Sequence, residues 1–265
     1  MAQVTYTVGL LDGGATLVYR GTLELQMQTD YMGTTPTAGL LSLQGFAPLL
    51  LTAVSGSGTA WNLNGSNGSL SVAFTSIYPN VQPQGQAPTC ISGSIALTPS
   101  GQGQQSLLLM GYTGTGAAPA AHVESAAAGN AALQAGAGVT QYNLGLTLLD
   151  SAFAPAGAAA FTDTGQMVQI GPVSRQWHVT GTLSGNGMPD GGIAVQGWGS
   201  EFFWGASGQS GNTQVSLSMV ASTFIPTITD GTLTVNGATA FFVGTPVAQS
   251  TIPVPHIADR AAEPA

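Results

Sequence analysis

The densest group of side chains that could hold a ligand lies between residues 196 and 204. It contains one amide, one carboxylate and two indole rings, on Gln196, Glu201, Trp198 and Trp204. An indole ring can stack on the apolar face of a sugar ring, and an amide can orient the sugar through hydrogen bonds. We therefore predict that these four residues form part of a ligand-binding site.

A shorter pattern in the first half of the chain is similar to this group. Gln44-Gly45-Phe46 parallels Gln196-Gly197-Trp198, and Trp61 follows in a segment that is longer than its counterpart in the second half. We add Gln44 and Trp61 to the predicted ligand site on this basis. The same residues also fit a strand with a glycine bulge and an inward-facing aromatic ring, which is the more frequent arrangement.

The aromatic residues near position 203 also predict an orientation. Neighbouring side chains in a strand point to opposite faces, so Phe203 must oppose Phe202 and Trp204. At least one large ring then faces away from the core. Such a ring serves either as a ligand platform or as a contact with another subunit.

Catalytic chemistry finds little support in the sequence. Residues 205–209 come nearest to a Gly-x-Ser-x-Gly elbow but lack its final glycine. Asp12, Asp190 and Asp230 each precede glycine, and we interpret them as turn residues. Only Glu24 and Glu201 remain as acids for a glycosidase-type pair. We predict no catalytic residue and keep an enzyme with a carboxylate-based site as the last of three functional alternatives.

Metals and cofactors are not expected either. The three histidines are scattered, and the single Cys90 excludes both a Cys-x-x-Cys zinc site and an intramolecular disulfide. We interpret His178 as a structural residue of a strand. The glycines at 111–116 lack the βαβ setting of a dinucleotide-binding loop.

The chain is acidic and contains no lysine. Its formal net charge is -8 at pH 7, and only 5% of its residues are charged. Phosphate-binding lysines, Schiff-base amines and Ser-x-x-Lys pairs are therefore excluded. Without a positive patch, we expect neither nucleic acid nor an anionic lipid surface as a partner.

The elements that must position these side chains are strands. Apolar residues alternate with polar ones in Leu23-Glu24-Leu25-Gln26-Met27, which indicates an antiparallel sheet with one wet face. Asn236-Gly237 between two apolar runs predicts a type I′ hairpin, and we give the pairs Asn64-Gly65 and Asn67-Gly68 a similar role. Long helical patterns are absent. We predict an all-β fold of antiparallel sandwich or barrel units.

Three segments recur in the same order, which indicates an internal duplication. Residues 6–10 match 142–146, residues 44–46 match 196–198, and residues 69–71 match 216–218. We predict four parts: a first β unit at 1–116, an Ala/Gly-rich linker at 117–138, a second β unit at 139–246 and a Pro-rich C-terminal tail at 247–265.

These observations favour a non-catalytic binding protein, lectin-like or toxin-like, whose loops present aromatic and amide side chains to a neutral glycan or another small polar ligand. The alternative is a self-assembling subunit of a shell, fibre or coat, because a surface poor in charge favours contacts between copies. A homo-oligomer fits both. The sequence begins without a secretory signal pattern and has no apolar run of about 18 residues. An extracellular or surface role and a cytoplasmic one both remain open.

Overall fold

Strands account for the regular structure of this chain. A computed structural model describes residues 2–30, 33–57, 60–79, 88–114, 142–163, 166–169, 175–185, 188–199, 203–221 and 228–246. Within these ranges every regular element is a β-strand, and no helix has the length and apolar character needed to cross a membrane. The predicted linker and the predicted tail lie outside the described residues.

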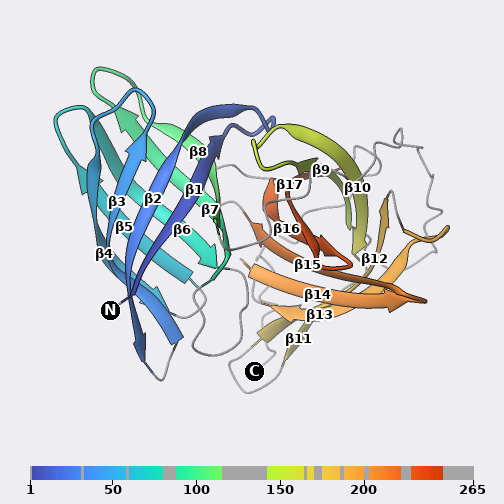
Figure 1. Ribbon diagram of the computed structural model, residues 1–265. Helices are drawn as coiled ribbons and strands as arrows, with labels where there is room; N and C mark the ends of the chain where they lie inside the picture. The colour runs from blue at the N-terminus through green and yellow to red at the C-terminus, as the bar shows by residue number, and fades with distance from the viewer. Residues whose placement is uncertain are drawn as a thin grey trace, which may run out of the picture.

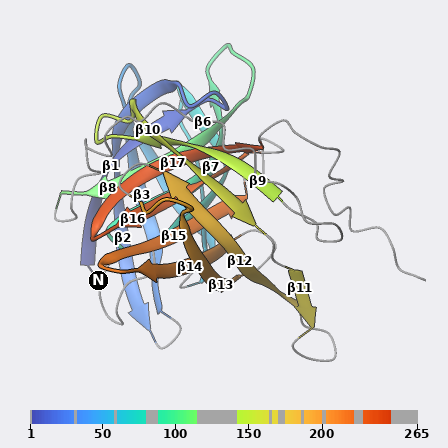
Figure 2. The same ribbon diagram turned by 90° about the vertical axis from the view of Figure 1, so that its right-hand side faces the viewer.

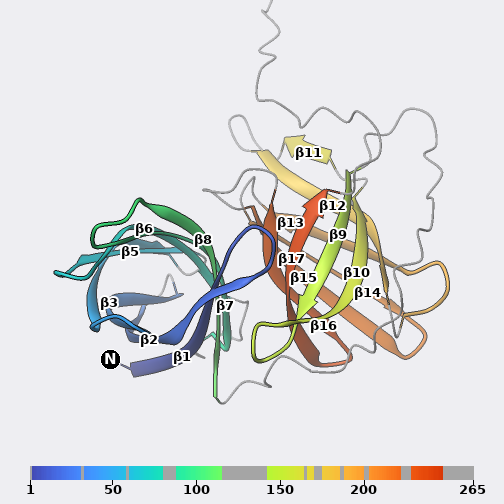
Figure 3. The same cartoon turned by 90° about the horizontal axis from the view of Figure 1, so that it is seen from above.

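Eight strands form the first barrel, and each is antiparallel to its neighbours. In chain order they are β1 (Ala2–Leu11), β2 (Leu17–Asp30), β3 (Gly33–Leu43), β4 (Leu49–Ser57), β5 (Ala60–Ser66), β6 (Leu70–Pro79), β7 (Cys90–Pro99) and β8 (Gln105–Thr113). The sheet closes because β8 pairs back onto β1, with Leu109 opposite Leu10. Figure 3 shows these strands arranged as a ring.

Nine strands form the second barrel. They are β9 (Tyr142–Leu149), β10 (Pro155–Asp163), β11 (Gln166–Gln169), β12 (Arg175–Gly185), β13 (Ile193–Gly199), β14 (Phe203–Ser210), β15 (Thr213–Ala221), β16 (Thr229–Val235) and β17 (Ala238–Pro246). β17 pairs with β9, and β10 pairs with both β9 and β12, which closes the sheet. β10 and β11 together take the place of the long β2. The prediction of two similar antiparallel β units is confirmed, and both units are barrels.

Alternation along the strands determines which side chains fill each barrel. Leu23, Leu25 and Met27 of β2 are at most 1% exposed, while Gln26 between them lies on the outside. This is the arrangement that the sequence pattern predicted. Burying a side chain of this size stabilises the fold by roughly 1.5–3 kcal/mol. The inward-facing residues of each barrel form a separate apolar core.

The register of the strand pairs supports the duplication independently of sequence. In the first barrel, an inward-facing residue of β5 lies opposite a residue of β6, and that residue lies opposite a glycine of β7. The second barrel has the same arrangement on β14, β15 and β16. The residues are Trp61, Ile77 and Gly93 in the first barrel and Trp204, Met219 and Gly231 in the second. Both glycines have a positive φ angle, and a Cβ on either would strike a carbonyl oxygen of the neighbouring strand.

The turns after the first strand of each barrel are also equivalent. Asp12 Oδ1 accepts hydrogen bonds from the backbone N–H groups two and four residues ahead, at 2.9 Å each. Asp150 Oδ1 does the same at 2.8 and 3.0 Å. Ala15 and Phe153 occupy the left-handed region at the same place, with φ of 62° and 61°. Residues 10–12 and 148–150, both Leu-Leu-Asp, are therefore a true repeat that the sequence comparison missed.

The three segments matched from sequence are not equivalent residue by residue. Residues 6–10 occupy the register positions in the first barrel that residues 144–148 occupy in the second. The first sequence match is therefore shifted by two positions. Residues 70–71 and 216–218 lie on the equivalent strands β6 and β15 but at different register positions, and residue 69 precedes β6. Gln44-Gly45-Phe46 forms a turn between β3 and β4, whereas Gln196-Gly197-Trp198 lies inside β13. This last match is wrong, because similar triplets serve a turn in one barrel and a strand in the other.

A third apolar cluster joins the barrels, which lie side by side with β7 against β16 (Figure 1). Outward-facing side chains of both barrels meet in it, including Leu11, Leu108 and Met110 of the first and Phe153, Phe241 and Val243 of the second. The Tyr112 hydroxyl crosses the contact and donates to the Ser151 carbonyl at 3.1 Å. Figure 2 shows β16 and β17 of the second barrel in front of β7 and β8. The two barrels therefore share an apolar contact in addition to their own cores.

Candidate functional site

The sequence predicted six ligand-binding residues, and the structure places the five that it describes at separate locations. Gln196 and Trp198 lie on β13 and point outward, as their exposure shows. Trp204 lies on β14 and packs against the core of the second barrel. Gln44 and Trp61 belong to the first barrel. Glu201 lies outside the described residues, and its role stays a prediction.

Trp61 is a core residue, which corrects its assignment to the ligand site. Its side chain is 0% exposed and belongs to the core of the first barrel. The reason is alternation along β5, where Trp61 and Leu63 point inward and Asn62 lies on the outer face. An indole in this position offers no ring face to a ligand in solution.

Gln44 is exposed in the turn between β3 and β4, and its backbone N–H donates to the Arg20 carbonyl at 2.9 Å. Phe46 beside it packs its ring edge-on against Tyr19, with 5.5 Å between the centroids. This turn belongs to the end of the first barrel. Gln44 and Gln196 are therefore not equivalent, and the expected duplication of the site is not supported.

The prediction that one large aromatic faces away from the core is confirmed for Phe203. Its ring stacks on Tyr78 of the first barrel, with a centroid distance of 5.9 Å and an angle of 3° between the planes. Trp204, next in the chain, points inward. The other half of the molecule therefore covers the outer face at the start of β14, and the surface open to a ligand begins further along this strand.

Trp198 is the exposed aromatic of the second barrel. It is 50% exposed and stacks on His178, its cross-strand neighbour on β12, at a centroid distance of 4.3 Å and an angle of 25°. Its cross-strand neighbour on the other side is Gly205 of β14. A Cβ at Gly205 would approach only the Leu217 carbonyl oxygen, at 3.6 Å. On the β14 side, therefore, the described residue directly opposite the indole has no side chain.

A row of neutral polar side chains runs across the strands next to Trp198. It starts at Gln196 on β13 and continues through Ser207 on β14, Ser216 on β15 and Thr234 on β16, each opposite the next. Because all four residues share a register position, their side chains point to the same face of the sheet. The outer face therefore combines one aromatic ring with a line of hydrogen-bonding groups.

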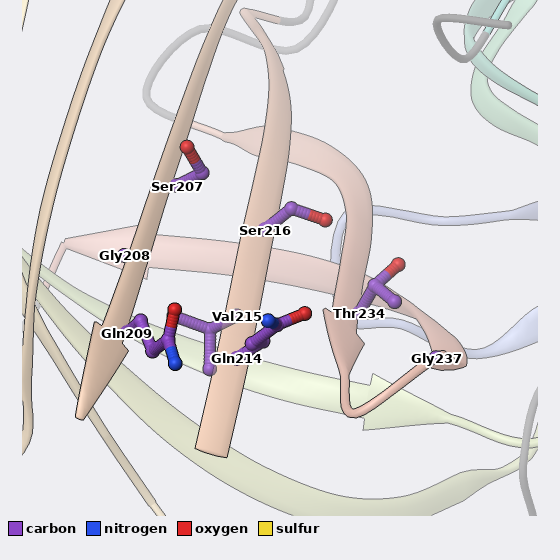
Figure 4. Close-up of a pocket in the computed structure, with 8 residues that line it drawn as sticks. All are labelled: Ser207, Gly208, Gln209, Gln214, Val215, Ser216, Thr234 and Gly237. Atoms are coloured by element: carbon purple, nitrogen blue, oxygen red, sulfur yellow. The ribbon is translucent and has the colours of Figure 1, made fainter. Parts of the chain in front are cut away.

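An open pocket of about 600 Å³ lies over the last three residues of this row, Ser207, Ser216 and Thr234 (Figure 4). None of its lining residues is charged; they are Ser207, Gly208, Gln209, Gln214, Val215, Ser216, Thr234 and Gly237. The β16–β17 hairpin borders the pocket, and two hydrogen bonds of Asn236 hold this hairpin in place. Asn236 Oδ1 accepts from the Gln214 backbone N–H at 2.8 Å, and the Asn236 backbone N–H donates to the Gln214 carbonyl at 2.9 Å. Asn236 and Gly237 have φ of 48° and 83°, which confirms the predicted type I′ turn.

None of the residues that line the pocket was among the six predicted to bind a ligand. The signal was present, because Gln214, Ser216 and Ser218 alternate with buried apolar residues along β15. Serine and threonine are common on any exposed sheet face, so these residue types alone do not indicate a binding site. Only the register, which aligns Ser216 with Gln196 through Ser207, distinguishes these hydroxyls from others.

Among the described residues of the first barrel there is no equivalent of the Trp198 surface. The register places Ser55 and Asn62 at the positions of Trp198 and Gly205. Asn62 Nδ2 donates to Ser55 Oγ at 2.9 Å, and Ser76 Oγ donates to Asn62 Oδ1 at 3.4 Å. These side chains bind one another and present no ring, so the described part of the first barrel offers no matching platform.

Four described residues have a raised pKa, and none of them lines the pocket: Tyr6 lies in the core of the first barrel, and Asp230, Tyr78 and Cys90 lie at the contact between the barrels. Asp230 is a strand residue and not the turn residue that its Asp-Gly sequence suggested. It is fully buried, its Oδ2 accepts from the Gly93 backbone N–H at 2.9 Å, and burial raises its pKa well above the usual value. Burial also raises the pKa of Tyr78, with the Asp230 charge adding to the shift, and that of Cys90 to about 11.

The described residues contain no group of three or more His, Cys, Asp or Glu side chains that could hold a metal ion. Besides the Val215 side chain, the pocket carries hydroxyl, amide and backbone groups. Neutral groups of this kind can donate and accept hydrogen bonds, but they supply no nucleophile with a paired base. The arrangement is suited to binding.

No family model and no curated protein matches the sequence. Three solved structures align with most of the chain: the Myxococcus xanthus hemagglutinin in complex with a3,a6-mannopentaose (12% identity, 92% of this chain, 100% of that chain, TM-score 0.21), the Burkholderia oklahomensis agglutinin (10%, 92%, 95%, 0.22) and a protein of unknown function from the DUF3598 family of Nostoc punctiforme (11%, 93%, 96%, 0.27). Such TM-scores do not establish a common fold.

Proposed function

We propose that this is a non-catalytic, lectin-like protein that holds a neutral glycan on the outer face of β13 to β16. The observation that carries the proposal is the half-exposed Trp198 ring beside the side-chain-free Gly205. Gln196 and the pocket residues continue from this ring along the same face. Trp204 supports the sheet from inside rather than touching the ligand.

The chemistry of this surface suits a sugar better than a charged ligand. A pyranose ring has an apolar face that can stack on an indole, and hydroxyl groups around its edge that need hydrogen-bond partners. Ser207, Ser216 and Gln214 offer both donors and acceptors. An anionic ligand would find no cation among the lining residues, so its desolvation would be uncompensated.

A glycan array of neutral oligosaccharides, followed by isothermal titration calorimetry with the best ligand, tests the proposal. We expect Trp198→Ala to lose most of the binding, because the stacking surface is removed. Gly205→Val should also lose it, because a valine fits a strand but fills the space beside the indole. Leu50→Ala, which truncates an exposed apolar side chain of the first barrel, is the matched control and should bind normally.

The stoichiometry gives a second test of the same proposal. Because Ser55 and Asn62 replace the ring and the glycine in the first barrel, we expect one glycan per chain rather than two. Failure of the intact protein to bind any neutral glycan would refute the function. Unchanged binding by Trp198→Ala and Gly205→Val would refute the site.

Self-assembly remains a second candidate, and one feature of the first barrel supports it. Leu50 and Val54 on β4 are 76% and 61% exposed, and Val18 on β2 is 41% exposed. Removing such side chains from water favours association by about 25 cal/mol per Å² of apolar surface. Size-exclusion chromatography with light scattering at several concentrations tests this. Large particles that Leu50→Gln disperses would support assembly, and a monomer at all concentrations would exclude it.

A further inference from the structure

We propose that the site takes an extended chain of at least three neutral sugar rings, lying across β13 to β16, rather than one terminal sugar. This inference rests on the proposed function and adds the size and direction of the ligand. It follows from the length of the polar row and from the position of the pocket at the end of the row away from Trp198.

The row is longer than one sugar ring. Neighbouring strands lie about 4.8 Å apart, so the three steps from the strand of Trp198 to the strand of Thr234 span roughly 14 Å. Ser207 and Ser216 lie between these ends, each one strand further on. A single ring stacked on Trp198 therefore leaves the pocket groups beyond Ser207 without contact.

The two ends of the row differ in chemistry. At β13 the Trp198 indole offers a flat apolar face. At β16 the Thr234 hydroxyl is hydrogen-bonded to the Thr239 hydroxyl at 2.9 Å. A chain of sugars can place one ring on the indole and its later rings over the hydroxyls, while a compact ligand can reach only one end. No charged residue interrupts the path among the residues that line the pocket.

The test is calorimetry with a homologous series of one to five linked neutral sugars, chosen from the class that the array identifies. We expect the affinity to rise up to about three rings and then level off. Ser216→Ala and Thr234→Val each remove one hydroxyl, and each should weaken binding of the trisaccharide by roughly two- to tenfold. Neither should change binding of the monosaccharide. Trp198→Ala should weaken every member of the series.

The results separate this inference from the function on which it rests. If a monosaccharide binds as tightly as the longest oligosaccharide, the extended site is refuted while glycan binding stands. The same conclusion follows if Ser216→Ala and Thr234→Val leave the trisaccharide affinity unchanged and circular dichroism shows both variants folded. If no member of the series binds, both proposals fail together.

Discussion

Two tryptophans of this protein should respond in opposite ways to truncation. Trp61 is fully buried in the core of the first barrel, while Trp198 is half exposed on the outer face of the second. We predict that Trp61→Ala strongly destabilises the fold without acting at the ligand site. Trp198→Ala should remove ligand binding with little loss of stability.

The structure sets the size of both effects. Truncating a buried tryptophan costs about 3–5 kcal/mol, because packing is lost and a cavity is left. The main loss at Trp198 is its stack on His178, and such an aromatic pair contributes about 0.5–1.5 kcal/mol. At roughly 2–4 °C per kcal/mol for a protein of similar size, the melting temperature should fall by about 6–20 °C for Trp61→Ala and about 1–6 °C for Trp198→Ala.

Differential scanning calorimetry and urea unfolding of the full chain measure these losses. Trp61→Phe is the matched control, since it keeps an aromatic ring and removes an indole N–H that has no hydrogen-bond partner. It should cost less than Trp61→Ala. Equal losses for Trp61→Ala and Trp198→Ala would refute the assignment of one ring to the core and the other to the surface.

Three further changes test other parts of the structure. Burial raises the pKa of Asp230 above its usual 3.8, so its contribution to stability is fully present below about pH 3.8 and is lost as the pH rises through the raised pKa. The urea midpoint of Asp230→Asn should not show this fall in stability with rising pH, whereas that of the exposed Asp190→Asn should. Burial raises the pKa of Cys90 from 9.0 to about 11, so a disulfide reagent should label it roughly 100-fold more slowly in the folded protein than in urea; equal rates would contradict its burial between the barrels. Gly237→Ala should cost about 1–2 kcal/mol because of its positive φ, whereas Gly68→Ala, in open space without a positive φ, should be neutral in thermal melts.

Much of the fold could be predicted because the signal is local. Leu23, Leu25 and Met27 alternate with polar residues, and Asn236-Gly237 has the sequence that a type I′ turn requires. The Asn-Gly dipeptide alone is not sufficient, since Asn64-Gly65 lies inside β5. Closure into barrels was not predictable, because it depends on β8 meeting β1 and β10 meeting β12, which are pairings between distant segments.

The candidate site was predicted only in part for a related reason. Trp61 alternates in phase with Leu63, and Trp198 alternates in phase with Gln196, so strand periodicity could have assigned one ring inward and the other outward. The pocket depends on which residues of β14, β15 and β16 lie opposite Gln196, and no local pattern contains that register. Asp230 was misread because the Asp-Gly turn preference is local, while its burial comes from contact with the other barrel.

Inward and outward strand positions differ in how freely their residues can change, and this difference explains why the proposed site lies on one barrel only. Inward positions must stay apolar to fill each barrel, so Trp61 and Trp204 keep the same role. Outward positions are constrained only where the barrels touch. Along β14 the outward residues pass from Phe203, which Tyr78 of the first barrel covers, to Gly205 beside the exposed indole and then to Ser207 at the pocket. The first barrel therefore bounds the proposed site at one end of the strand, where Tyr78 covers Phe203.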